Sequence, residues 1–146
     1  KGVRTGAKDL IARAPARYRG TDKIRGRVMR HFRDFWPYYL QEHARPGTRA
    51  LHYAGTSLVV AMVASAPLIG GWWLALALPV AGYGFAWAGH GLVERNRPAT
   101  FRYPLWSLRA DFLMWVRFLT GHMRGDLARA GVRSDGTVDP ARRITA

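Results

Sequence analysis

The sequence contains no cysteine among its 146 residues. Disulfide bonds and thiolate metal sites are therefore excluded, and any metal ion must be held by histidine, aspartate, glutamate or carbonyl oxygen. Acidic residues are also scarce, with 9 Asp and Glu against 23 Lys and Arg and a formal net charge of +14. A charge of this sign favours negatively charged partners, which are anionic lipid head groups or nucleic acids.

Charged side chains are absent from one long stretch, which runs from Tyr53 to Val93. This stretch is too long for one membrane helix of about 20 residues and about right for two. Pro67, Gly70 and Gly71 offer a turn inside it, so the sequence predicts a helical hairpin over about 49–94, with spans at about 49–67 and 72–94. The first span is slightly short for a full crossing, so a re-entrant hairpin stays open as an alternative.

Both flanks of the apolar stretch are basic. Basic flanks around an even number of spans place both termini in the cytoplasm. Since arginine far outnumbers lysine, as in GC-rich bacterial genomes, the expected location is a bacterial cytoplasmic membrane. Nucleic acid is not expected as a partner, because most Trp and Tyr lie in or beside the apolar stretch and do not alternate with basic residues.

The chain divides into three predicted parts. Residues 1–30 are a basic N-terminal arm, with a transit peptide as the alternative, and residues 125–146 are a polar C-terminal tail. Between them, 31–124 form a membrane domain in which Thr48 caps the first span and amphipathic helices over 31–44 and 101–123 lie at the interface. The predicted fold is an all-α membrane protein, a two-helix transmembrane or re-entrant hairpin flanked by amphipathic interfacial helices.

A hairpin ends on the side of the membrane where it begins, which brings four polar residues to one level. They are His43, His52, His90 and Glu94. His90 and Glu94 are four positions apart and share one helical face. Imidazole and carboxylate without thiolate suit Fe(II), Mn or Zn, so these four are the candidate metal ligands and catalytic residues. The alternative is a set of hydrogen-bonding interfacial histidines without a metal.

The sequence contains two further histidines. His122 lies at the end of the second interfacial helix and stays open as an additional ligand. His31 lies beside the basic arm and is not expected to take part.

The segments that carry these residues resemble a known family. Tyr39–His43, Arg49–Gly55, Gly89–Glu94 and Arg97–Ala99 are similar to segments of the small membrane proteins related to the fungal 2-hydroxy fatty acid dioxygenase, and the resemblance covers roughly 32–119. It implies an Fe(II)-dependent oxidation that shortens a 2-hydroxy fatty acid by one carbon. It also implies His43, His52 and His90 as iron ligands, with Glu94 as a ligand or as the partner that orients an imidazole.

This resemblance leads to expectations about the substrate. A 2-hydroxy acid can chelate Fe(II) through its hydroxyl and one carboxylate oxygen. Arg97, supported by Arg49 or Arg45, is expected to pair with the carboxylate, although each arginine could instead contact lipid phosphate. Tyr83 and Trp87 are expected to line the acyl chain along the hairpin.

A function of another class fits the same features. The basic arm, the interfacial aromatic helices and the small size also suit an accessory subunit of a larger membrane protein complex, which would bind lipid and partner helices without catalysis.

Overall fold

The computed structural model describes residues 29–145, and almost all of the basic arm predicted over 1–30 lies outside them. Its helices, in chain order, are α2 (Phe32–Glu42), α3 (Pro46–Ile69), α4 (Leu74–Ala88), the π-helix η2 (Gly89–Glu94), the 3-10 turn η3 (Ala99–Phe101), α5 (Pro104–Leu119), α6 (Met123–Ala130) and the 3-10 turn η4 (Pro140–Arg142). Within 29–145 there is no β-strand, and an isolated bridge joins Val132 and Val138. The predicted all-helical fold is confirmed.

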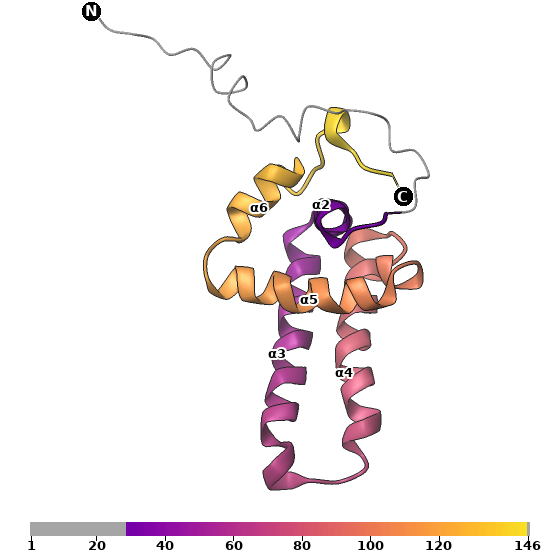
Figure 1. Ribbon diagram of the computed structural model, residues 1–146, viewed down its shortest axis with the longest axis vertical. Helices are drawn as coiled ribbons and strands as arrows, with labels where there is room; N and C mark the ends of the chain where they lie inside the picture. The colour runs from indigo at the N-terminus through magenta and orange to yellow at the C-terminus, as the bar shows by residue number, and fades with distance from the viewer. Residues whose placement is uncertain (1–28, 146) are drawn as a thin grey trace, which may run out of the picture.

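The helices α3 and α4 run side by side as a hairpin, with their connection at the end far from the other helices (Figure 1). Gly70 and Gly71 make this turn with φ values of 45° and 117°, which glycine adopts without steric cost. Pro67 stays inside α3. The predicted cap at Thr48 is wrong, because Pro46 already occupies the first helical turn, where its missing N–H costs nothing, and Arg45 precedes it as the N-cap.

Close packing of the hairpin depends on residues without bulky side chains. A Cβ atom added to Gly55 of α3 would lie 2.9 Å from the Cβ of Phe85 on α4. One added to Gly89 would lie 3.1 Å from Cγ2 of Thr48. Small residues let two helices approach closely, which is the usual way that helices pack in membranes.

One helix of the described chain is long and apolar enough to cross a membrane, and it is α3. Its 24 residues are about 36 Å long, more than the roughly 30 Å of a hydrocarbon core. The α-helical part of α4 has only 15 residues, or about 22 Å. The hairpin is therefore observed as a fold, while length and composition support membrane crossing for α3 alone.

The helix α5 crosses the hairpin at the end opposite its turn, and α2 and α6 lie beyond it (Figure 1). The core at this end is formed by α2, α5 and α6 and includes Phe35, Tyr39, Leu40, Ala110 and Met114. The α5 side chains Ser107, Ala110 and Met114 are buried there. A different stripe of α5, at spacings of three and four, is apolar and exposed, and it consists of Leu105, Leu108, Phe112, Val116 and Leu119.

The C-terminal segment differs from the predicted polar surface tail, because part of it packs against α2. Buried Gln41 donates from Nε2 to the carbonyl oxygens of Ala130 at 2.7 Å and Arg142 at 2.8 Å. Its Oε1 accepts from the backbone N–H of Ile144 at 2.8 Å. The backbone of the segment satisfies a buried amide, an interaction that side-chain hydropathy does not reveal.

The hairpin contact can be tested with a matched pair of variants. We expect Gly55→Ala to lower the thermal midpoint in mild detergent, since the new methyl group meets Phe85 and overpacking costs about 1–3 kcal/mol. The control is Gly84→Ala, where a Cβ meets nothing within 4 Å, and alanine should stabilise the helix by about 0.5–1 kcal/mol. Circular dichroism measures both thermal midpoints. Equal shifts of the two midpoints would contradict the close approach of α3 and α4.

Candidate metal centre

Three buried histidines from three elements meet beneath α5. They are His43 at the C-terminal end of α2, His52 in α3 and His90 in η2, and one ligand atom from each lies within 4.8 Å of the others. The ring centroids of His43 lie 4.5 Å from those of both His52 and His90. Three of the four polar residues predicted from the sequence therefore lie together. The short break after α2 brings His43 close to His52, and the hairpin brings His90 to the same level.

Each imidazole has its Nδ1 beside a hydrogen-bond acceptor. Nδ1 of His43 lies 2.6 Å from the carbonyl oxygen of Tyr39, and Nδ1 of His52 lies 2.8 Å from Oδ1 of Asp111. Nδ1 of His90 lies 2.7 Å from Oδ1 of Asn96. Because carbonyl, carboxylate and amide oxygens only accept, each Nδ1 carries the proton and donates it. The lone pair of each ring is therefore on Nε2.

The free nitrogen atoms fit a metal ion. Nε2 of His43 and Nε2 of His52 are buried and have no hydrogen-bond partner among residues 29–145. A buried polar atom without a partner costs about 1–3 kcal/mol, so two beside each other need an explanation. A cation bound to these nitrogens supplies it, and metal-binding histidines usually donate their other N–H to a carboxylate or carbonyl, as all three do here.

The protonation state of His43 also suits a ligand. Burial, followed by the neighbouring imidazoles of His52 and His90, holds the pKa of His43 well below its ordinary value. The ring is neutral at pH 7 and needs no deprotonation to bind a metal. Burial and the adjacent Asp111 raise the pKa of Tyr39 well above its ordinary value, so its hydroxyl stays protonated and donates to Asp111.

His90 lies in a π-helix and is buried. In a regular helix, the spacings of four, three and four would place Tyr83, Trp87, His90 and Glu94 on one stripe, but η2 changes the number of residues per turn after Ala88. His90 is only 2% exposed, whereas Trp87 is 55% exposed. Short π-helical turns inside α-helices are frequent at functional sites, and this one carries a buried candidate ligand.

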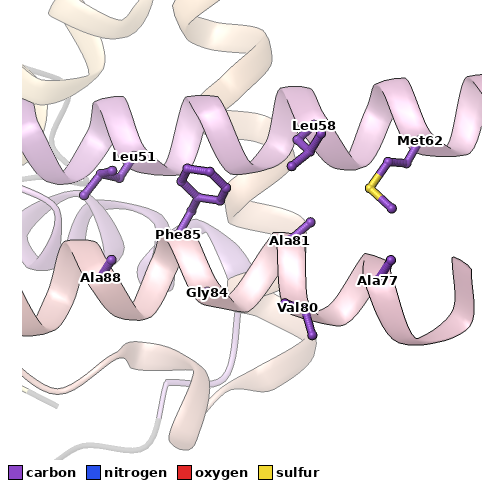
Figure 2. A pocket seen from close by; sticks show the side chains of 9 residues that line it. All are labelled: Leu51, Leu58, Met62, Ala77, Val80, Ala81, Gly84, Phe85 and Ala88. Atoms are coloured by element: carbon purple, nitrogen blue, oxygen red, sulfur yellow. The ribbon is translucent and has the colours of Figure 1, made fainter. Parts of the chain in front are cut away.

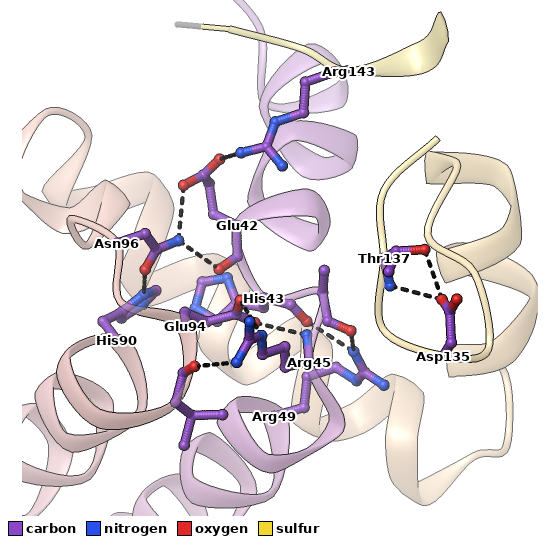
Figure 3. Close-up of polar contacts among 12 residues, drawn as sticks. Glu42, His43, Arg45, Arg49, His90, Glu94, Asn96, Asp135, Thr137 and Arg143 are labelled. Atoms are coloured by element: carbon purple, nitrogen blue, oxygen red, sulfur yellow. Dashed lines mark hydrogen bonds and ion pairs between the residues drawn. The ribbon is translucent and has the colours of Figure 1, made fainter. Parts of the chain in front are cut away.

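Glu94, expected as a ligand or as a partner of an imidazole, has another contact. Its Oε1 accepts the backbone N–H of Arg45 at 2.7 Å, and its Oε2 lies 3.9 Å from Nε of the same residue (Figure 3). It has no hydrogen bond to the three imidazoles in the part of the chain described. Glu94 thus ties the end of η2 to the start of α3.

Two residues that orient the imidazoles were not singled out in the sequence. Asp111 of α5 accepts from both His52 and Tyr39, and it is the only acidic residue between Phe101 and Met123, a signal that could have found it. Asn96 follows η2, and its Nδ2 donates to the carbonyl oxygen of Glu42 at 3.0 Å and to Oε2 of the same residue at 2.9 Å. These donations turn the amide oxygen of Asn96 toward His90 (Figure 3).

The remaining candidates lie outside this group. Arg49 donates to the carbonyl oxygen of His43 at 2.8 Å, and Arg45 donates to that of Val93 at 2.8 Å. Arg97 is exposed, and within 29–145 its side chain has no hydrogen bond or ion pair.

The aromatic candidates and the two extra histidines are also at the surface. The exposed rings of Tyr83 and Trp87 have centroids 6.0 Å apart. His122 is exposed, with Nδ1 at 3.0 Å from Oγ1 of Thr120, and His31 is the exposed N-cap of α2. Neither histidine joins the group of three.

Comparison with known families gives one match. Residues 29–123 match the family described as 2-hydroxy-palmitic acid dioxygenase Mpo1-like, and this range is well over half of the chain. The chain belongs to this family. The Mpo1-like segment includes the three histidines, Asp111 and Asn96, whereas almost all of α6 and the C-terminal segment follow it. No curated protein and no solved structure matches the chain.

The contact between His52 and Asp111 can be tested through metal binding. We expect Asp111→Asn to weaken metal affinity about 10 to 100-fold, because an uncharged amide in place of the carboxylate makes His52 less basic. Competition with a chromophoric chelator measures this affinity. Asp135→Asn, which changes an exposed carboxylate far along the chain, is the control. Equal affinity of the two variants would remove Asp111 from the centre.

Proposed function

We propose that this Mpo1-like protein is an Fe(II)-dependent dioxygenase that shortens 2-hydroxy fatty acids by one carbon at a membrane surface. The observation that carries the proposal is the group of three buried imidazoles, each oriented by its own acceptor, inside the segment that matches the family. The description of that family supports the substrate class and the reaction type.

The donor set fits iron in such a reaction. His43, His52 and His90 would hold the ion through Nε2, and three neutral nitrogen ligands leave coordination positions open for a chelating substrate and for O2. Bound iron would supply Lewis acidity toward the hydroxy acid and redox chemistry with O2, neither of which the protein's side chains provide.

The proposed reaction balances without an external reductant. The carbon that bears the hydroxyl becomes the carboxyl carbon of the shortened acid, and the original carboxyl group leaves as carbon dioxide. O2 accepts the four electrons that this oxidation releases. The shortened acid and carbon dioxide together take four of the five oxygen atoms. The fifth oxygen atom leaves as water with the two remaining hydrogen atoms.

The residues around the ion would prepare the ligands and the substrate. Asp111 and Asn96 hold the rings of His52 and His90 in one orientation and keep the proton on Nδ1. Arg97 directly follows Asn96 and, unlike Arg45 and Arg49, does not donate to a main-chain carbonyl within the described residues. Arg97 is therefore the best candidate of the three arginines for pairing with the substrate carboxylate.

Exposed apolar side chains support a membrane location for this centre. On the hairpin they include Val63, Leu68, Ile69, Trp72, Leu76 and Val80, and on α5 they form the stripe from Leu105 to Leu119. A soluble surface rarely keeps such contiguous apolar patches. We infer that the hairpin enters the bilayer and that α5 lies in the interface, with the histidines near the level of the lipid head groups and both termini on one side.

His90→Ala tests the iron centre. We expect this variant to lose most of its bound iron and its turnover of 2-hydroxypalmitate, because only two imidazoles remain to hold the ion. Metal analysis and mass spectrometry of the shortened acid are the measurements. His31→Ala is the control and should change neither, since its ring is exposed and outside the group. Full iron and full turnover in His90→Ala would contradict the iron centre, whereas an unaltered protein without iron or turnover would favour the accessory-subunit function.

Cysteine labelling tests the membrane arrangement. Single cysteines at Trp72, an exposed residue beside the hairpin turn, and at Ser134, in the C-terminal segment, can be placed in this cysteine-free chain. We expect an impermeant thiol reagent to reach them from opposite sides of intact vesicles, because α3 is long enough to cross. Reaction of both positions from one side would favour a re-entrant hairpin.

A further inference from the structure

An apolar groove of about 550 Å³ runs between α3 and α4. Its lining comes entirely from nonpolar residues, which are Leu51, Leu58, Met62, Ala77, Val80, Ala81, Gly84, Phe85 and Ala88 (Figure 2). The volume lies within the range of about 300–1,000 Å³ that small-molecule sites usually have. Since no charged or hydrogen-bonding side chain lines the groove, only a hydrocarbon group is complementary to it.

One end of the groove is formed by residues that neighbour two of the histidines in the sequence. At one end lie Leu51, which directly precedes His52, and Ala88, two residues before His90. At the other end lie Met62 and Ala77, near the hairpin turn (Figure 2). From residue 51 to residue 62 the helix rises by about 16 Å, so the groove is long as well as apolar.

Small residues on α4 keep the groove open. The two helices touch closely where Gly55 meets Phe85, but Ala77, Ala81, Gly84 and Ala88 present little or no side chain to the groove. At Gly84 a Cβ atom would meet nothing within 4 Å. The space is therefore a consequence of residue choice on one helix.

We propose that this groove binds the hydrocarbon chain of a fatty acid with its carboxyl end at the histidines, and that Met62 and Ala77 limit the length of the chain. The orientation of the fatty acid rests on the proposed function. Tyr83 and Trp87, the residues expected to line the chain, are not part of the groove, because they point to the outer face of α4.

Three alanine-to-leucine variants on α4 separate the parts of the groove. Ala77→Leu fills its far end and should weaken binding of 2-hydroxypalmitate about tenfold while leaving 2-hydroxyoctanoate unchanged, since only the longer chain loses buried methylene groups there. Ala88→Leu fills the end beside the histidines and should weaken both acids. Ala75→Leu adds the same side chain at an exposed position outside the groove and should weaken neither.

Binding is measured by displacement of a fluorescent fatty acid from the metal-free and the iron-loaded protein in detergent micelles, and turnover is followed separately. If a variant shows no thermal transition and is therefore unfolded, Gly84→Leu replaces it. The added side chain enters open space, and it should weaken binding of the longer acid at least as much as binding of the shorter one. Equal effects of Ala77→Leu and Ala75→Leu would overturn the groove assignment and indicate that the chain lies in the surrounding lipid.

The two proposals fail in different ways. The expected binding pattern without turnover of any 2-hydroxy acid would support the groove and contradict the dioxygenase function. Turnover of 2-hydroxypalmitate with no difference among the three variants would support the function and overturn the groove.

Discussion

The structure depends on the meeting of three imidazoles. Each Nδ1 donates to a fixed acceptor, which leaves the lone pair of each ring on Nε2. Without a cation this arrangement keeps buried acceptors unpaired, which costs free energy, and a bound cation turns the cost into ligation. The elements at this end of the molecule converge here because α2, α3 and η2 each supply a ring while α5 supplies the carboxylate that holds one of them. Orientation of the rings is thus a property of the whole fold.

Departures from regular helix gather at the same place. The chain breaks between α2 and α3, passes through a π-helix at His90 and then adopts a left-handed conformation at Arg95, with φ of 58°. A residue other than glycine in this conformation costs roughly 1–2 kcal/mol, and such strain persists where surrounding contacts enforce it. The next residue, Asn96, is the one that bonds His90, so the turn at Arg95 delivers the acceptor to the ring.

Sequence reasoning recovered the residues whose positions follow from topology. A hairpin must bring His52 and His90 to one level, and a short break must keep His43 near them, whatever the details of packing. It did not place Glu94, because the four-residue spacing from His90 assumes a regular α-helix and η2 is not one. Asp111 was missed because its helix was predicted only as an amphipathic interfacial helix. The packing of Gln41 against the C-terminal segment depends on backbone carbonyls, which a sequence pattern cannot show.

The location of the centre agrees with the chemistry of an amphipathic substrate. A 2-hydroxy fatty acid has all of its polar atoms at one end, and it needs water or protein donors there and an apolar surrounding for the rest. The polar residues Asn96 and Glu42 lie beside His90, while the lining of the groove begins at Leu51 and Ala88 and is wholly apolar. Under the proposed function, this change from polar to apolar surroundings would fall near the reactive carbons. The rings would then decide where the acid is oxidised, and the groove would decide which acids reach them.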